Sequence, residues 1–199
     1  MTVQARQLRV AGGWEFTPTV HHDARGVFAS PLQEEAFVAA VGHPFPVAQT
    51  NHIVSDRGVL RGVHFTASPG QSKYVHCAAG RALDVMIDVR TDSPTFGTWE
   101  AVELDPRRCN ALYFPIGTAH AFMALEPGTI MSYLVSTPYD AELELAIDPF
   151  DPELALPWPA DVPALLSGRD EVAMSFAQAR AGGLLPRSGP RMVAEGVEP

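Results

Sequence analysis

Lys73 is the only lysine of this chain, and the other thirteen long cationic side chains are all arginines. It follows His64 by nine residues, across the turn Ser68-Pro69-Gly70. An arginine stays charged, whereas burial can tune the pKa of a lysine, so a lysine near a histidine suggests acid–base chemistry. Two plainer interpretations compete with this one: a lysine retained by chance, and a histidine that is a hydrogen-bonded core residue.

A second histidine lies in the segment Pro115–His120, which has the PxGxxH pattern of the metal-binding cupins. Those β-barrels also need an HxH pair and a glutamate from the first half of the barrel, but His64 is followed by Phe65 and Thr66. One histidine does not supply the three protein ligands that a divalent ion requires. The sequence therefore predicts a cupin barrel without a metal, in which His64 and His120 perform acid–base chemistry or are structural.

Composition narrows the class of protein. With 199 residues and 46% apolar content, one domain is expected, which we place at residues 1–185, followed by a flexible tail at 186–199 that is rich in proline, glycine and charge. The net charge of −9 argues against nucleic-acid binding. No apolar run is long enough to cross a membrane, and no secretory signal precedes residue 16. Cys77 and Cys109 lack a CxxC spacing, so a cytoplasmic protein is expected.

The elements that must position these histidines are mostly short strands. Eighteen prolines and 16 glycines interrupt the apolar runs, a pattern typical of an all-β sandwich or barrel. Alternation places Lys73, Val75 and Cys77 on one face of a strand, and it separates Asp84 from the apolar face of the next strand. The predicted strands are 8–10, 26–28, 47–53, 59–65, 73–79, 81–90, 99–104, 111–114, 120–124 and 130–136.

Helical patterns are few. Residues 31–41 have a helical period and end at Gly42, which can terminate a helix. Residues 171–180 form a second predicted helix, with Ser167 or Asp170 as its N-cap and the pair Gly182-Gly183 at its end. These patterns predict an all-β protein with a few short helices.

A series of motifs in a fixed order makes a resemblance specific. Between Asp23 and Asp170 the chain resembles the dTDP-4-dehydrorhamnose 3,5-epimerase family, which inverts carbons next to the ketone of a nucleotide-linked 4-keto-6-deoxy sugar. The resemblance implies a cupin-type double-stranded β-helix. The matching motifs are Asp23-Ala-Arg-Gly26, Gln49-Thr-Asn51, Gly58-Val-Leu-Arg-Gly-Val-His64, Gln71-Ser-Lys73, residues 84–90, Ser93-Pro-Thr-Phe-Gly97, residues 115–122, residues 133–139, Asp151-Pro with Leu156-Pro-Trp158, and Ser167-Gly-Arg-Asp170.

The resemblance also implies a role for individual residues. His64 would be the base, Asp170 its carboxylate partner, Tyr133 the acid that reprotonates the opposite face, and Lys73 the cation at the ketone oxygen. A positioned base contributes about 10²–10⁴ in rate, and one preorganised donor at an enolate oxygen contributes about 3–4 kcal/mol, so both are needed. The implied substrate-binding residues are Arg25 at the diphosphate, Gln49 and Asn51 near the sugar, Arg61 beside Lys73, Asp84 and His120 as a second acid–base pair, Tyr139 stacked on thymine, and Arg169.

The implied ligand is a dTDP-linked 4-keto-6-deoxyhexose, with no cofactor and no metal. The implied assembly is a homodimer that exchanges N-terminal strands, with Arg25 reaching the partner's site. Without the resemblance, Asp170 is interpreted more simply as the N-cap of a helix. We also expect Arg61 to lower the pKa of Lys73 and Asp84 to raise it.

Two departures from the family pattern lie at Ser30, where a glutamate commonly meets the nucleotide, and at Phe150, where a polar residue precedes Asp151. They resemble the branch of the family that serves antibiotic deoxysugars, some of whose members invert only C3. Two alternatives therefore stay open: inversion of C3 alone, and inversion of both C3 and C5. Two other functions also stay open: a cupin 3,4-ketoisomerase and a non-catalytic cupin that binds a nucleotide sugar.

Overall fold

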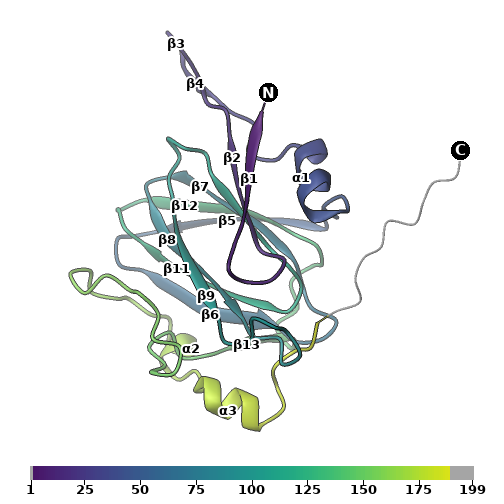
Figure 1. Cartoon of the computed structure of the whole chain (residues 1–199). Helices are drawn as coiled ribbons and strands as arrows, with labels where there is room; N and C mark the ends of the chain where they lie inside the picture. The colour runs from purple at the N-terminus through teal and green to yellow at the C-terminus, as the bar shows by residue number, and fades with distance from the viewer. Residues whose placement is uncertain (1, 189–199) are drawn as a thin grey trace, which may run out of the picture.

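The computed structural model describes residues 2–188, which form two antiparallel β-sheets closed into a barrel (Figure 1). One sheet has the strand order β1-β2-β10-β7-β12-β5 and the other β13-β6-β11-β8-β9, while β3 and β4 pair separately. The elements are β1 (Val3–Gln7), β2 (Trp14–Pro18), β3 (His21–Asp23), β4 (Gly26–Phe28), α1 (Glu34–Val41), β5 (Gln49–Ser55), β6 (Leu60–Thr66), β7 (Lys73–Ala79), β8 (Ala82–Asp88), β9 (Trp99–Leu104), β10 (Ala111–Phe114), β11 (Thr118–Ala124), β12 (Thr129–Val135), β13 (Glu144–Ala146), α2 (Gly168–Glu171) and α3 (Phe176–Ala181). This architecture confirms the predicted all-β cupin-type fold.

The barrel is filled by one face of each sheet. Val75 and Cys77 of the six-stranded sheet pack against Met86 and Leu104 of the five-stranded sheet, and all four are buried. Burial of each such side chain stabilises the fold by about 1.5–3 kcal/mol. The alternation predicted for β7 and β8 is thus confirmed, with Lys73 and Asp84 on the faces that turn inward.

Each sheet is covered on its outer face. Phe37 of α1 packs against Phe16, Tyr74 and Tyr113 of the six-stranded sheet. The C-terminal segment covers the five-stranded sheet through side chains that include Phe176 of α3. Each sheet therefore has both of its faces covered, which explains why odd- and even-numbered residues of β8 are buried alike.

Most strand predictions agree with the structure to within two residues, and 26–28, 73–79, 99–104 and 111–114 are confirmed at both ends. The prediction of a strand at 8–10 is wrong, because these residues form the turn between β1 and β2 and fill the core from there. Four strands were not predicted: β1, β2, β3 and β13. β1 is an edge strand with mostly exposed polar side chains, and such a strand carries little apolar alternation.

The helix predicted at 171–180 is wrong as a single element. The chain forms α2, capped by Ser167, and then α3, capped by Ser175 in a reciprocal bond with Gln178. Between them Met174 pairs with Ile147, so backbone pairing to the barrel interrupts the helix. The helix predicted at 31–41 begins later, at Glu34, and ends as expected at Gly42 in a left-handed conformation.

The predicted tail begins inside the described residues, where Thr91 donates to the carbonyl of Pro186 and Ser188 donates to Asp92. The rest of that segment, 189–199, lies outside them. Across residues 2–188, no helix has the length and apolar character needed to span a bilayer.

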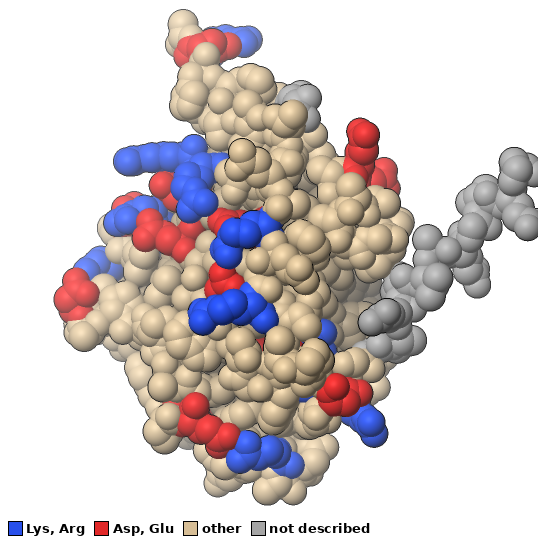
Figure 2. All heavy atoms as spheres, in the orientation of Figure 1, with Lys and Arg blue, Asp and Glu red and all other residues tan. Residues whose placement is uncertain are grey.

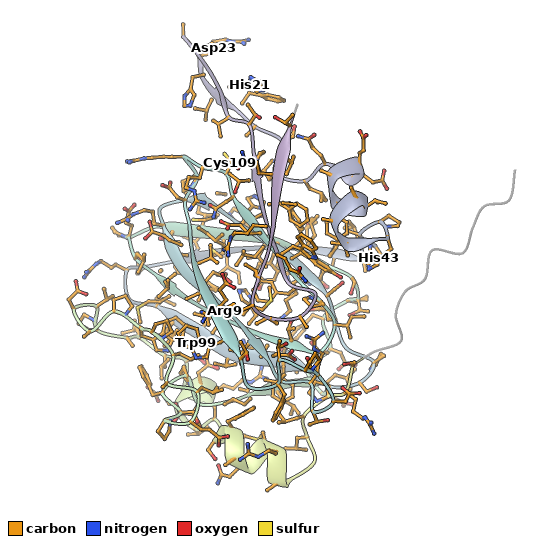
Figure 3. The ribbon with its side chains drawn as sticks, in the orientation of Figure 1. Arg9, His21, Asp23, His43, Trp99 and Cys109 are labelled. Carbon is orange, nitrogen blue, oxygen red and sulfur yellow. The ribbon has the colours of Figure 1, made fainter. Side chains whose placement is uncertain are left out.

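The hairpin β3–β4 projects from one end of the barrel, and α2 and α3 lie at the opposite end (Figure 1). Asp23 lies at the tip of the hairpin, far from the barrel (Figure 3). On the face in view, basic and acidic side chains are interspersed without a large patch of one sign (Figure 2). Among the ion pairs of the chain, Arg6 bonds to both Glu15 and Glu100.

Candidate active site

A cavity of about 450 Å³ opens between the two sheets. It receives side chains from both sheets and from the segment that precedes α2. The lining includes most of the predicted site residues: Asn51, Arg61, His64, Lys73, His120, Tyr133, Tyr139, Arg169 and Asp170. The structure therefore brings together residues that lie far apart in the sequence.

His64 and Asp170 form a hydrogen-bonded pair in this cavity. The Nε2 atom of His64 lies 2.7 Å from Oδ1 of Asp170, which is only 3% exposed. Burial alone raises the pKa of Asp170, but the hydrogen bonds from His64 and Ser167 outweigh it, so the pKa is lowered. An ionised carboxylate accepts, so Nε2 carries the proton and Nδ1 is left with a free lone pair. His64 is thus arranged as a base whose reactive atom is Nδ1.

An irregularity in β6 points Arg61 and His64 into the same cavity. Residues three apart in a regular strand face opposite ways. Between the pairs His120–His64 and Phe122–Arg61, however, β6 has one residue more than β11, which is a β-bulge. Gly62 lies in this bulge with φ 115°, and a Cβ atom there would be 2.6 Å from the Cβ of Ala121, so only glycine fits.

His120 and Asp84 form a second, more deeply buried pair. Nε2 of His120 lies 2.7 Å from Oδ2 of Asp84, and the carboxylate is fully buried. Burial raises the pKa of Asp84, against the influence of His120 and Lys73. The ring of His120 also contacts the ring of Tyr133 edge-on, with centroids 6.2 Å apart. The pair supports the floor of the cavity beside Tyr133.

Lys73 is 7% exposed, and burial lowers its pKa. Glu144 and then Asp84 act in the opposite direction and favour the ammonium. The expected effect of Asp84 has the predicted sign, but the dominant cause is burial, and the stronger of the two carboxylates is Glu144. When it is protonated, Lys73 places a concentrated positive charge in a buried wall of the cavity.

Tyr133 lies on β12 of the six-stranded sheet, whereas His64 lies on β6 of the five-stranded sheet. The two side chains therefore enter the cavity from facing sheets. Burial raises the pKa of the Tyr133 phenol, and a hydrogen bond from Asn51 lowers it in part. Because the pKa remains raised, the phenol keeps its proton at neutral pH and can serve as an acid.

Three predicted site residues do not line the cavity. Asp84 lies behind His120, to which it is hydrogen-bonded. Gln49 donates a hydrogen bond to Asn51, two residues further along β5. Arg25 lies on the projecting hairpin, 89% exposed, and pairs with Asp23 (Figure 3). Within one chain the structure does not bring Arg25 to the other site residues.

Sequence reasoning missed two parts of the site. Glu144 lies on the unpredicted strand β13 and accepts a hydrogen bond from Thr66. An apolar wall was also missed, since its residues look like ordinary core positions in the sequence. The wall consists of Ile53, Val59, Leu60, Phe122, Leu165 and Leu166. In the part of the chain that is described, no group of three or more His, Cys, Asp or Glu side chains could hold a metal ion.

Comparison with known proteins identifies the family of this chain. The sequence model of the dTDP-4-dehydrorhamnose 3,5-epimerase family matches residues 7–178. The chain belongs to this family. The dTDP-4-dehydrorhamnose 3,5-epimerase of Mycobacterium tuberculosis is 46% identical over 188 residues, which cover 93% of each chain.

Two solved structures of the family are closely similar. NovW, a 4-keto-6-deoxy sugar epimerase from the novobiocin gene cluster of Streptomyces spheroides, superposes with a TM-score of 0.91, at 43% identity over 94% of each chain. ChmJ, a 3'-monoepimerase from Streptomyces bikiniensis solved with dTDP-quinovose, has a TM-score of 0.87, at 45% identity over 90% of this chain and 91% of its own. The family thus includes epimerases named for C3 and C5 and others named for C3 alone, several of them from Streptomyces.

Proposed function

We propose that this chain inverts C3 of a dTDP-linked 4-keto-6-deoxyhexose by removing a proton next to the ketone and returning one to the opposite face. One observation carries the proposal: His64 and Tyr133 enter one cavity from facing sheets. Inversion needs a base on one face of the sugar ring and an acid on the other. Membership of the epimerase family supports the same reaction.

In the first step, Nδ1 of His64 takes the proton from C3, and the C–H electron pair becomes the double bond of an enolate. Asp170 holds the ring through Nε2 and stabilises the imidazolium that forms. A positioned base contributes about 10²–10⁴ in rate, or about 3–5 kcal/mol. This is too little on its own, because a carbon acid beside a ketone is far weaker than an imidazolium.

The enolate oxygen must therefore be stabilised, and Lys73 has the charge and the burial to do it. Its ammonium faces a poorly hydrated cavity, in which a charge acts more strongly than in water. One preorganised donor of this kind contributes about 3–4 kcal/mol. Glu144 and Asp84 favour the charged ammonium, since both raise the pKa of Lys73 against the larger effect of burial.

In the second step, the enolate electron pair forms a new C–H bond with the proton of the Tyr133 phenol, and the C4–O bond becomes a ketone again. A phenolate remains on Tyr133 and an imidazolium on His64. One proton passes from His64 to solvent and one from solvent to Tyr133, so the cycle balances without a cofactor.

The nucleotide end of the substrate binds at the rim of the cavity in this proposal. A second hollow of about 510 Å³ adjoins the cavity and shares Tyr139, which is 56% exposed and free to stack on thymine. The similar epimerase ChmJ was solved with dTDP-quinovose bound, which supports a dTDP ligand for this chain too. The free thiols of Cys77 and Cys109 support a cytoplasmic setting.

We further propose a homodimer in which Arg25 serves the site of the partner, because its hairpin projects away from its own barrel (Figure 1). Mixing two inactive variants, Arg25→Ala and His64→Ala, should then restore activity. Hybrids would carry one site with His64 from one chain and Arg25 from the other. An inactive mixture whose hybrids form would contradict the shared site.

Proton NMR of dTDP-4-keto-6-deoxyglucose incubated in D₂O tests the reaction. Deuterium should appear at C3 while the ketone stays at C4, and label at C5 as well would extend the activity to both carbons. His64→Ala should abolish exchange, whereas the control His43→Ala, outside the cavity, should not. A ketone at C3 would instead indicate a ketoisomerase, and binding without exchange a non-catalytic protein.

A further inference from the structure

The segment that carries Asp170 is paired with the chain that enters β6, the strand of His64. Leu165 makes this connection: its N–H donates to the carbonyl of Gly58 at 2.8 Å, and its carbonyl accepts from the N–H of Leu60 at 3.0 Å. Asp170 follows five residues later. The backbone therefore brings Asp170 beside His64, but it leaves the carboxylate free to rotate about its Cβ–Cγ bond, a torsion with broad minima.

Ser167 removes that freedom through two hydrogen bonds to Asp170. Its Oγ atom lies 3.2 Å from the backbone nitrogen of Asp170 and 2.9 Å from Oδ2 of the same residue. A backbone N–H only donates, so Oγ accepts from it, and an ionised carboxylate only accepts, so the hydroxyl proton goes to Oδ2. Oδ1 already accepts from Nε2 of His64 at 2.7 Å. Both oxygens of the carboxylate are therefore held, one by the base and the other by Ser167.

We propose that Ser167 is a positioning residue for the base: its hydroxyl fixes the carboxylate of Asp170, which in turn holds the ring of His64 for proton removal. Ser167 acts on the reaction only through Asp170, so its bond to Oδ2 matters most when the imidazolium forms. The same bond helps to keep the carboxylate ionised, since it lowers the pKa of Asp170. This inference rests on the proposed role of His64 as the base.

A purely structural role competes with this proposal, because Ser167 is also the N-cap of α2. Ser167→Gly separates the two roles, since glycine at an N-cap is almost as favourable as serine but has no hydroxyl to donate to Oδ2. Water that replaces the hydroxyl solvates Oδ2 without an anchor on the backbone, so the carboxylate regains its rotation. We expect kcat for deuterium uptake at C3 to fall at least about fivefold at unchanged KM.

A double-mutant cycle with Asp170→Ala tests whether Ser167 acts through the carboxylate. Alanine at position 170 leaves the serine hydroxyl no side chain to hold. In the Asp170→Ala background, Ser167→Gly should therefore lower kcat by less than about twofold, although it costs at least about fivefold in the wild-type background. A general weakening of α2 or of the fold would instead lower kcat by the same factor in both backgrounds.

Two matched variants complete the experiment. Ser175 is the N-cap of α3, accepts from the backbone nitrogen of Gln178 at 3.1 Å and lies outside the cavity. Ser175→Gly should therefore keep kcat within about twofold of wild type. Ser167→Thr keeps a hydroxyl and an N-cap, and it should restore kcat to within about threefold of wild type. Thermal denaturation of every variant checks that the fold is intact.

A wild-type kcat for folded Ser167→Gly would overturn the inference, and so would an equal loss in both backgrounds of the cycle. A rise in KM at constant kcat would also overturn it, because Ser167 would then be a contact of the substrate. The proposed function fails in a different way. If His64→Ala and Asp170→Ala both keep wild-type exchange, the base is wrongly assigned and the inference falls with it. If both lose exchange while Ser167→Gly does not, only the positioning role is refuted.

Discussion

Replacing Asp170 by asparagine tests the base directly, because the two side chains are nearly the same size. In the structure Oδ1 accepts from Nε2 of His64 at 2.7 Å, and Oδ2 accepts from the hydroxyl of Ser167 at 2.9 Å. An asparagine that keeps its oxygen toward His64 preserves the ring orientation but loses the negative charge. One that turns its NH₂ toward His64 forces the proton onto Nδ1 and removes the base.

The magnitude follows from the bond that is lost. A hydrogen bond to a charged group contributes about 1.5–3 kcal/mol. The charge matters most when the imidazolium forms, so this energy belongs to the transition state and lowers kcat. At about 1.4 kcal/mol for each factor of ten, Asp170→Asn should reduce kcat about 10- to 150-fold. KM should change little, since Asp170 is only 3% exposed and its two oxygens are already bonded to His64 and Ser167.

The assay is the initial rate of deuterium uptake at C3, measured over a range of substrate concentrations. Asp92→Asn is the matched control, since Asp92 also accepts from a serine hydroxyl, at 2.9 Å, but lies outside the cavity. The control should keep the wild-type kcat. Thermal denaturation of both variants checks that the fold is intact.

A value of kcat for Asp170→Asn within about twofold of wild type, in a folded protein, would refute this reasoning. It would mean that the proton is removed without help from the carboxylate, and that Asp170 only holds the capping residue Ser167 of α2 in place. A rise in KM at unchanged kcat would assign Asp170 to substrate binding. Either result would remove the His64–Asp170 pair from the mechanism.

Three further predictions concern the charge, the stability and the backbone of the site. Lys73→Met should bind substrate but lose about 10²–10³ in kcat. Because the pKa of Lys73 is lowered, the wild-type kcat should fall with rising pH before lysine's usual 10.5 is reached. Lys73→Arg should move that fall to higher pH in a profile of rate against pH. Asp88→Asn should destabilise the fold by about 3–5 kcal/mol in urea unfolding, because Arg90 loses its buried partner. Burial alone raises the pKa of Asp88, but bonds from Arg90, Ser93 and Thr95 lower it below 3.8, so this stability is present above that pH and lost below it; a gap between the variants that shrinks above pH 5 would contradict the assignment. Gly62→Ala should cost more than about 1 kcal/mol and lower kcat, since the new Cβ would overlap Ala121 and shift His64; unchanged melting and kcat would show that the bulge tolerates a side chain.

Strand positions were predictable where one pattern dominated. β7, β9 and β10 alternate or form short apolar runs between turns, so both ends could be predicted from the sequence. β1 could not, because an edge strand with exposed polar residues resembles a loop, and β13 could not because it is only three residues long. The break between α2 and α3 was equally hidden, since it depends on the pairing of Met174 with Ile147.

The residues of the candidate site were likewise predictable only in part. Alternation within single strands predicted that Lys73 shares a face with Val75 and Cys77 and that Asp84 shares one with Met86, and the structure agrees; that both of these faces turn inward was seen only in the structure. Glu144 was missed because its role depends on where β13 pairs, and its influence on the pKa of Lys73 exceeds that of Asp84. The homodimer and the limits of the domain remain predictions.

The sequence by itself determined the kinds of groups in the site, the all-β class and the family, because these depend on residue types and on motifs in a fixed order. Only the tertiary structure decided that Arg61 and His64, three residues apart, point the same way, since an extra residue in β6 opposite β11 reverses the alternation there. It also decided that Tyr133 faces His64 from the other sheet and that Arg25 stands away from its own cavity. Local periodicity carries no information on such relations, because they arise from pairing between strands that are distant in the chain.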